Sequence, residues 1–303
     1  MRFIPTTQMQ SGDPCVASSA NGGVSGSFTS ASVTYNYHEF TSSDVNTTEG
    51  FLFQITRGYT QKARVIVVGG GASGGATSQF QGGGGGGGNV LDQTNVHLYP
   101  TNTYQIQVGK GGDAAYPGAG IPTEQGLNGD SSRFFQLPQI NYTAQYGEGG
   151  DANEPPNFGY DGGTSGGGFV GGSDAAANYG GGGGGASAVG QSATFSQAGD
   201  GGAGYTINLG YTSPTFGTST ISVGGGGGGA LGNGVGTAAD RGFGTDGGGN
   251  GNGGGFRTED GTRHSGGGGG GGLVIDAIDP NDDRGSIGGD GIVIVIYPTG
   301  SCF

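Results

Sequence analysis

The sequence predicts an all-β protein whose strands lead into a large inserted bundle of extended polyglycine helices. Of 303 residues, 80 are Gly, yet 15 Phe and 13 Tyr are spread along the whole chain. The β-branched run Val65–Val68 passes directly into Gly69–Gly71, and no segment has helical periodicity of useful length. Disordered chains usually combine high charge with few aromatic residues. Only 11% of this chain is charged, so we expect it to fold.

Residues 1–30 are polar and small, with Pro5, Pro14 and a Ser/Gly run that ends at Ser27. This composition predicts an N-terminal attachment arm rather than a domain. Such an arm either docks on a neighbouring protein or stays disordered, and both alternatives remain open.

Residues 31–112 are expected to form the first part of the β structure together with the first glycine block. Around Tyr35, apolar and polar residues alternate with the period of two that is typical of strands. Further strands are predicted at Gly50–Ile55, Ala63–Val68, Asn89–Leu98 and Thr103–Val108. The last of these alternates so regularly that one of its faces should be buried.

Residues 113–272 are expected to form the main polyglycine bundle, with short strands and loops. Glycine runs begin at residues 180, 224 and 266, which indicates a loose repeat. Short strands are predicted at Ser132–Phe135, Tyr142–Tyr146, Tyr205–Leu209 and Thr220–Val223.

The long glycine runs predict mutual packing of backbones. Each ordered Gly costs roughly 0.5–1 kcal/mol more conformational free energy than Ala, and Gly has no side chain to bury. The remaining interaction that can offset this cost is the backbone hydrogen bond, which contributes a net stabilisation of about 0.5–1.5 kcal/mol. An extended three-fold helix has no internal hydrogen bonds, so neighbouring helices must satisfy one another. The alternative is a set of solvated flexible loops, against which the interspersed aromatic residues argue.

Residues 273–303 are expected to return to the sheet with the strand Gly291–Pro298 and to end in a tail. This strand and Val65–Val68 are both unbroken apolar runs, which is typical of strands buried on both faces. We therefore expect them in one sheet, near its centre. The predicted core-strand residues are Val65, Ile66, Val67, Val68, Ile292, Val293, Ile294, Val295 and Ile296.

The net charge of −13, with only two lysines, argues against nucleic-acid binding and against an anionic membrane surface. No stretch approaches the ~18 apolar residues of a membrane span, and none resembles a signal peptide. We therefore expect synthesis in a cytoplasm and no membrane insertion. Cys15 and Cys302 either pair, link subunits or stay as thiols.

No residue pattern predicts a catalytic site, a cofactor site or a metal site, so an enzyme is the least favoured class. His38 and His97 are expected to be ordinary strand residues, and His264 a solvated loop residue. The acidic cluster Asp279–Asp283 has oxygen ligands suited to Ca²⁺, but a solvated turn is the simpler interpretation.

The order of motifs resembles that of the glycine-rich domain proteins of tailed-phage virions, including tail fibres and adhesins. The resemblance covers residues 31–298 and is most specific at the first strand-to-glycine junction and at the closing strand. The motifs are Tyr37–Ser43, Val65–Gly71, Tyr104–Gly109, Asn128–Phe134 and Gly289–Pro298. The glycine-rich extracellular domain of anaplastic lymphoma kinase receptors is a more distant likeness. Both likenesses imply a jelly-roll-like β-sandwich that carries a bundle of polyglycine II helices.

The resemblance implies a non-enzymatic structural protein of a phage virion, made in the host cytoplasm: a tail-fibre, fibre-tip or capsid-surface appendage subunit for assembly and host-surface contact. Residues 1–30 would bind other virion proteins, and a glycan or protein receptor would bind the exposed loops. A homo-oligomer, with a trimer favoured, is expected. The host-contact candidates are Tyr160, Phe169, Tyr179, Tyr205, Tyr211 and Phe216.

An ice-binding or cell-surface adhesive glycine-rich protein is the alternative function. Ice binding favours a regular array of Thr or Ala on one face, and the sequence has no strict tripeptide period.

Overall fold

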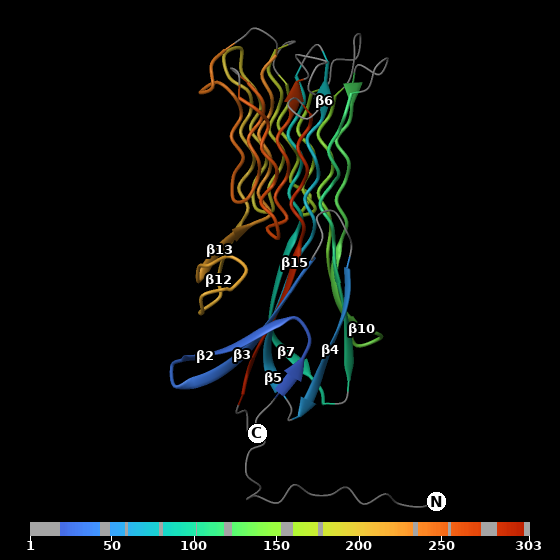
Figure 1. Cartoon of the computed structure of the whole chain (residues 1–303), viewed down its shortest axis with the longest axis vertical. Coiled ribbons are helices and arrows are strands. Elements are labelled where there is room, and N and C mark those ends of the chain that lie inside the picture. The colour runs from blue at the N-terminus through green and yellow to red at the C-terminus, as the bar shows by residue number, and fades with distance from the viewer. Residues whose placement is uncertain are drawn as a thin grey trace, which may run out of the picture.

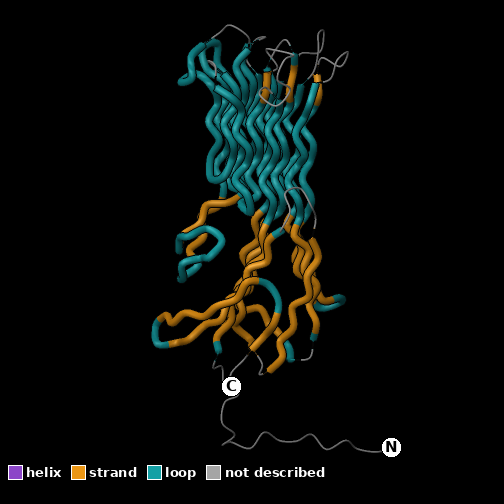
Figure 2. Tube along the Cα trace, in the orientation of Figure 1, coloured by secondary structure: helices purple, strands orange, loops and turns teal. Residues whose placement is uncertain are grey.

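The computed structural model describes residues 19–42, 49–57, 60–78, 81–100, 102–117, 123–152, 160–174, 178–232, 236–253, 256–273 and 284–299. The protein is all-β, and no helix occurs in these ranges, so none could cross a membrane there. The molecule is elongated. The main sheets lie at one end and a bundle of extended glycine-rich segments at the other (Figures 1 and 2).

Two five-stranded sheets form the sheet end of the molecule. The first sheet has the order β1 (Ser19–Asn21), β4 (Glu49–Arg57), β8 (Thr103–Val108), β10 (Ser132–Gln136) and β11 (Ile140–Ala144). The second sheet has the order β2 (Val24–Ser30), β3 (Val33–Thr41), β15 (Ile292–Pro298), β5 (Thr60–Val68) and β7 (Val90–Leu98). All neighbours in both sheets are antiparallel.

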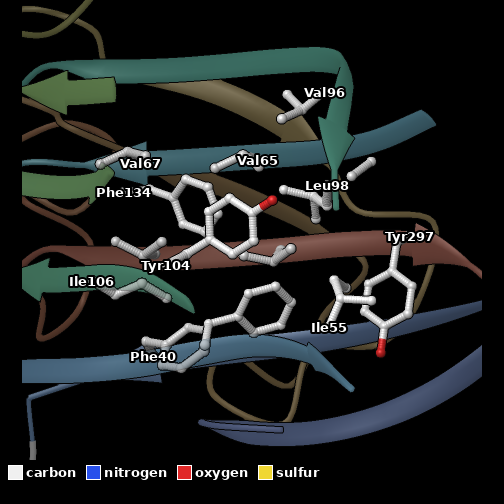
Figure 3. Close-up of a cluster of buried hydrophobic side chains, with 14 of the residues drawn as sticks. Phe40, Ile55, Val65, Val67, Val96, Leu98, Tyr104, Ile106, Phe134 and Tyr297 are labelled. Carbon is white, nitrogen blue, oxygen red and sulfur yellow. The ribbon is translucent and has the colours of Figure 1, made fainter. Parts of the chain in front are cut away.

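The two sheets face each other across one hydrophobic core, part of which Figure 3 shows. The first sheet contributes Phe53, Tyr104 and Phe134, whose rings lie within 6.2 Å of one another, centroid to centroid. The second sheet contributes Val65, Val67 and the β15 valines from the facing side. The strict alternation of β8 places Tyr104 and Ile106 in this core, as its period of two predicts.

β5 and β15 are antiparallel neighbours in the middle of the second sheet, with Val65 opposite Val295. The outer face of this sheet is covered by a hairpin of β12 (Tyr205–Asn208) and β13 (Thr220–Val223). A second apolar cluster lies there, between the hairpin and the outward Ile residues of β5 and β15. Both faces of the two strands are therefore buried, which explains their unbroken apolar sequence.

The N-terminal boundary expected at residue 30 is wrong. Residues 19–30 supply β1 and β2, which are edge strands of the two sheets. The ring of Phe28 on β2 stacks on Tyr35 and Tyr211, so this segment has its own packing contacts. Residues 1–18 lie outside the described ranges.

β2 and β3 form a hairpin with a two-residue loop, because Ser30 pairs with Val33. The loop residues Ala31 and Ser32 have φ values of 46° and 65°. Left-handed backbone costs an L-residue other than Gly, Asn or Asp roughly 1–2 kcal/mol. Two-residue turns of this kind favour Asn-Gly, and this hairpin lacks that sequence.

Replacing the loop by Ala31→Asn with Ser32→Gly should raise the free energy of unfolding by about 1 kcal/mol. Both new residues tolerate positive φ, so the backbone strain is relieved without a change in contacts. Urea denaturation of the purified chain measures the gain. The control is Ser30→Gly in the adjacent strand, which should lose about 0.5–1 kcal/mol. A double variant no more stable than the parent would contradict the strain that we assign to this loop.

The glycine-rich segments run along the bundle and hydrogen-bond to several neighbours each. Successive amides of residues 83–88 donate in rotation to three segments, which are 145–152, 179–185 and 266–272. The acceptors are, in order, the carbonyls of Asp151, Gly181, Gly269, Glu148, Gly184 and Gly266. The carbonyl groups of residues 82–87 and of Asn89 accept in turn from segments 69–75, 160–166 and 224–230. One segment is thus bonded on all sides to other backbones.

The longest glycine runs gather around this central segment because no side is left there for a side chain. Residues 180–185, 224–229 and 266–272 all exchange hydrogen bonds with residues 82–88. A Cβ on Gly84 would lie less than 3.0 Å from the carbonyl oxygen of Gly227. Peripheral segments carry side chains instead, and Val189 and Gln191 on the segment 188–193 are exposed.

The far end of the bundle holds a small three-stranded sheet of β14 (Gly272–Leu273), β6 (Ala76–Thr77) and β9 (Thr123–Glu124). At the other end, the chain returns to the first sheet with β10 and β11. Residues 132–144 therefore belong to the sheets, and the expected assignment of the whole range 113–272 to the bundle is corrected there. The β12–β13 hairpin likewise lies beside the second sheet (Figure 1).

Candidate binding surfaces

Two of the six predicted contact residues are buried and cannot form part of an exposed contact face. Tyr160 has no exposed surface and Tyr211 is 6% exposed. This corrects the expectation for both residues. The other four are spread over the molecule: Tyr179 pairs with Leu231 near the far end of the bundle, Phe169 lies at a turn between glycine segments, and Tyr205 and Phe216 belong to the β12–β13 region. The structure does not bring them together.

Tyr211 is buried because its ring and its hydroxyl both have partners on the second sheet. The ring stacks on Tyr37 with a centroid distance of 4.0 Å. The hydroxyl donates to a carboxylate oxygen of Glu39 at 2.7 Å. Burial, and then the neighbouring Glu39 carboxylate, raise the pKa of Tyr211 above its ordinary value. The residue therefore fixes the hairpin to the sheet.

Glu39 is a buried carboxylate, 1% exposed, that holds this covering segment in place. Besides Tyr211, it accepts hydrogen bonds from the Ser213 hydroxyl at 3.0 Å and from the Thr215 amide at 3.3 Å. A buried charge is stable only when it is hydrogen-bonded in this way. We therefore assign the Glu39 cluster a structural role, because both carboxylate oxygens already accept hydrogen bonds from the covering segment.

A second set of polar interactions, centred on Arg64, joins the hairpin to the edge of the second sheet. The Arg64 guanidinium forms two hydrogen bonds with the Asp92 carboxylate, at 2.8 and 2.6 Å. It also donates to the carbonyl oxygen of Asn208 at 2.6 Å. The Asp92 hydrogen bonds are the main cause that raises the pKa of Arg64. Arg64 thus connects β5, β7 and the hairpin.

The three histidines lie in different environments. His38 is buried on β3, where its ring contacts the Gly22 carbonyl oxygen at 2.6 Å and the Tyr297 hydroxyl at 3.2 Å. Burial lowers the pKa of His38. His97 is an exposed residue of β7. His264 is half-buried in a turn, and burial followed by the charge of Arg263 lowers its pKa to about 4. The expectation that His264 is solvated is therefore wrong.

The low pKa of His264 predicts a loss of stability in mild acid. The unfolded chain binds the proton near pH 6.5 and the folded chain only near pH 4. Stability is therefore complete above about pH 6.5 and falls as the pH drops toward 4. His264→Asn tolerates the φ of 64° at this position. It should remove about 1–2 kcal/mol of the decline between pH 7 and pH 5.

Thermal melts at pH 7 and pH 5 measure this effect. The control is His97→Asn, which should leave the difference between the two pH values as it is in the parent. Because His38 acts in the same direction, the His264 variant should keep part of the pH dependence. An unchanged decline in the His264 variant would contradict the assignment.

Three aspartates lie near the far end of the bundle, on adjacent segments. The Asp161 carboxylate accepts from the Asp174 amide at 3.0 Å, and the Asp151 amide donates to the Asp161 carbonyl. Burial, and then the Asp161 charge, raise the pKa of Asp151 and of Asp174. Among the residues that the structure describes, no group of His, Cys, Asp and Glu is arranged to hold a metal ion. The predicted cluster Asp279–Asp283, Cys15 and Cys302 lie outside those residues.

The outer face of the first sheet is the broadest candidate surface, and we name it the amide face. It consists of nine outward side chains on β4, β8, β10 and β11. These are Leu52, Gln54, Thr103, Gln105, Gln107, Arg133, Phe135, Asn141 and Thr143. In the strand register, Gln105 lies between Leu52 and Phe135, and Gln107 lies between Gly50 and Arg133.

Three open hollows meet on the amide face. The first, of about 380 Å³, is lined by Leu52, Gln105, Gln107 and Phe135 with neighbouring backbone. The second, of about 230 Å³, shares Gln105 and Phe135 with it and extends to Leu137. The third, of about 410 Å³, shares Gln107 and extends past Arg133 to Tyr146. The first hollow therefore adjoins the second at Gln105 and Phe135 and the third at Gln107.

Sequence reasoning missed the amide face, although part of its signal was present. The alternation of β8 predicts one buried face, and the opposite face then carries Thr103, Gln105 and Gln107. Which strands continue this face depends on the pairing of β8 with β4 and β10. That pairing brings together residues that are distant in the sequence, and alternation alone does not predict it.

Comparison with known families gives one match. A family model described as a glycine-rich domain matches residues 45–298. The matched range includes the whole glycine bundle and the strands from β4 to β15. No curated protein matches the chain.

Proposed function

The chain belongs to the glycine-rich domain family, and we propose that it is a non-enzymatic structural protein of a phage virion. In this proposal it is a tail-fibre, fibre-tip or capsid-surface appendage subunit that serves assembly and host-surface contact. The order of strand and glycine motifs in the sequence supports the virion assignment. The chain would be made in the host cytoplasm and incorporated into the particle.

We further propose that the bundle consists of polyglycine II helices inserted into a jelly-roll-like β-sandwich. Polyglycine II has three residues per turn and no internal hydrogen bonds. The amides of residues 83–88 return to the same neighbouring segment at every third residue, which supports this assignment. The two facing antiparallel sheets support the sandwich.

The observation that carries the functional proposal is the hydrogen bonding of the central glycine segment to backbones on every side of it. Residues 82–88 exchange backbone hydrogen bonds with six other segments. Such cross-linking in every lateral direction makes a stiff rod, since bending would stretch several hydrogen bonds at once. A stiff, elongated body suits an appendage that must hold contact residues away from its point of attachment.

The proposed partners follow from the same picture. Residues 1–18, which precede the sheets, would bind other virion proteins, and copies of the chain would associate, with a trimer favoured. A glycan or protein receptor on the host would be contacted through exposed residues. Phe169, Tyr179, Tyr205 and Phe216 remain as candidates after the removal of the two buried tyrosines. The net charge of −13 argues against nucleic acid and against an anionic membrane surface as partners.

Immunogold electron microscopy of purified particles tests the proposal. An antibody against the chain should label one site on the particle. A variant without residues 1–18 should melt at the same temperature as the parent but be absent from particles. Unlabelled particles would overturn the virion assignment, and incorporation of the truncated chain would overturn the attachment role of its N-terminal residues.

A further inference from the structure

We propose that the amide face binds an extended glycan that carries anionic groups. This inference rests on the proposed role in host-surface contact, for which it names the receptor class and a site. The site differs from the four aromatic residues that remain as contact candidates, because it lies on the first sheet.

The two sheets differ in what covers their outer faces. The outer face of the second sheet is covered by the β12–β13 hairpin and is apolar, with Ile66, Ile294 and Tyr211 buried. The outer face of the first sheet has no comparable covering element among the described residues. Leu52 is 64% exposed there, and Phe135 is half-buried. The face therefore presents apolar groups and amides to a partner.

The charge of the amide face is opposite to that of the chain as a whole. The chain has 23 Asp and Glu residues against 10 Lys and Arg. None of the nine outward side chains of the amide face is acidic, and one, Arg133, is cationic. One acidic residue, Asp130, lines the same hollow as Arg133, together with Gln107, Ser131 and Tyr146. The two hollows around Gln105 and Phe135 have no acidic lining residue, so an anionic ligand that reaches Arg133 from these strands meets a like charge only at Asp130.

Arg133 is available for a ligand. Within the part of the chain that the structure describes, its guanidinium makes no ion pair and no hydrogen bond, whereas other cations such as Arg64 and Arg241 pair with carboxylates. Arg is suited to bind carboxylate or phosphate groups through two parallel hydrogen bonds. It lies one register step from Phe135, on the same face of β10.

The remaining side chains have the chemistry that sugars require. Gln105, Gln107 and Asn141 each offer both a donor and an acceptor for hydroxyl groups. The ring of Phe135 offers an apolar surface for the C–H face of a sugar ring. The three adjoining hollows place Gln105, Gln107 and Phe135 in a row with Arg133 across several strands, which suits an extended chain better than a compact ligand.

Isothermal titration calorimetry of the full chain tests this inference with oligogalacturonate, phosphomannan and neutral mannan as probes. The two acidic probes distinguish carboxylate from phosphate as the recognised group. We expect at least one of them to bind, and to bind more tightly than neutral mannan. Arg133→Gln should weaken acidic-glycan binding about tenfold, through loss of a charge-assisted hydrogen bond, and remove its salt dependence. Phe135→Ala should weaken binding to a similar extent but keep the salt dependence.

The matched control is Phe195→Ala, because Phe195 is 83% exposed on the bundle, away from the amide face. It should bind like the parent. Absence of binding to every probe would overturn the inference, and so would Arg133 and Phe135 variants that bind the acidic glycans as tightly as the parent does. So would a parent protein that self-associates through this face, seen as a loss of oligomer in the Phe135 variant. The calorimetry uses the isolated chain, so a negative result there overturns the glycan site without bearing on the particle labelling, which tests the virion assignment.

Discussion

Gly84→Ala should destabilise the protein by about 4 kcal/mol or more, although it adds a single methyl group. The new Cβ would lie less than 3.0 Å from the Gly227 carbonyl oxygen, which belongs to backbone and has no rotamer to change. Segments 82–88 and 224–230 would have to separate. The hydrogen bonds that join them, such as that from the Gly227 amide to the Gly85 carbonyl, would lengthen together. Overpacking of this kind belongs to the largest mutational effects.

The sign of this effect is opposite to that expected for Gly→Ala at an open position. Gly50 on β4 supplies the control, because apart from the adjoining residues the nearest atom to a Cβ there would be the Ile106 carbonyl oxygen, at 4.0 Å. Gly50→Ala should stabilise the strand by about 0.5–1 kcal/mol, since Ala loses less conformational entropy on folding. Urea denaturation and thermal melts of both variants measure the contrast. A Gly84 variant that melts within a few degrees of the parent would contradict close backbone packing in the bundle.

The sequence alone thus predicts that the glycine runs pack through their backbones. Where side chains are missing over seven consecutive residues, as in Gly82–Gly88, the backbone must supply the contacts, and this is visible in the sequence. The sequence does not predict which glycine runs become neighbours. The contacts of residues 82–88 with 180–185 and with 266–272 join segments far apart in the chain, and identical residues carry no signal of their partners.

The apolar strands were predictable for a related reason. An unbroken run such as Ile292–Ile296 has nowhere to lie but between two covered faces. The covering hairpin was not predictable, because Tyr211 stands among Gly, Ser and Pro in a sequence typical of an exposed loop. Its burial depends on Glu39, which occupies the same outer face as Tyr37 and requires hydrogen-bond donors.

The β2–β3 hairpin was missed because its two-residue loop lacks the residues that are typical of such turns. Ala31 and Ser32 adopt left-handed backbone where Asn-Gly is the usual signal. Without that signal, residues 24–30 read as a continuation of a polar arm. The amide face was missed because it is a property of four paired strands, and glycine-containing segments separate β4 from β8 and β8 from β10 in the sequence.

Ile294→Asp should cost at least about 4 kcal/mol in the free energy of unfolding. Ile294 has no exposed surface and lies in the outer apolar cluster of the second sheet. It pairs with Ile66 on β5 and with Glu39 on β3. An aspartate there would be a buried charge beside the buried Glu39 carboxylate, which already takes the hydroxyl donors of Tyr211 and Ser213. Burial of an unpaired charge and repulsion between like charges act in the same direction.

Two controls separate charge from shape at this position. Ile294→Val removes one methylene and should cost only about 0.5–1.5 kcal/mol. Leu52→Asp places the same charge on the exposed face of the first sheet, where Leu52 is 64% exposed, and should change stability by less than about 1 kcal/mol. If the Ile294→Asp chain does not accumulate in folded form, Ile294→Asn gives a measurable intermediate, because it keeps the polarity without the charge.

The pH dependence of the Ile294→Asp variant distinguishes repulsion from simple loss of packing. Burial beside Glu39 would raise the pKa of the new carboxyl in the folded state above that in the unfolded chain. The penalty should therefore shrink as the pH falls and the carboxyl becomes protonated, while the penalty of Ile294→Asn stays constant relative to the parent. Melting temperatures of the parent and both variants between pH 7 and pH 5 measure this. A near-neutral effect of Ile294→Asp at pH 7 would mean that β5 and β15 do not form the centre of the sheet, and an equal penalty at both pH values would assign the loss to packing alone.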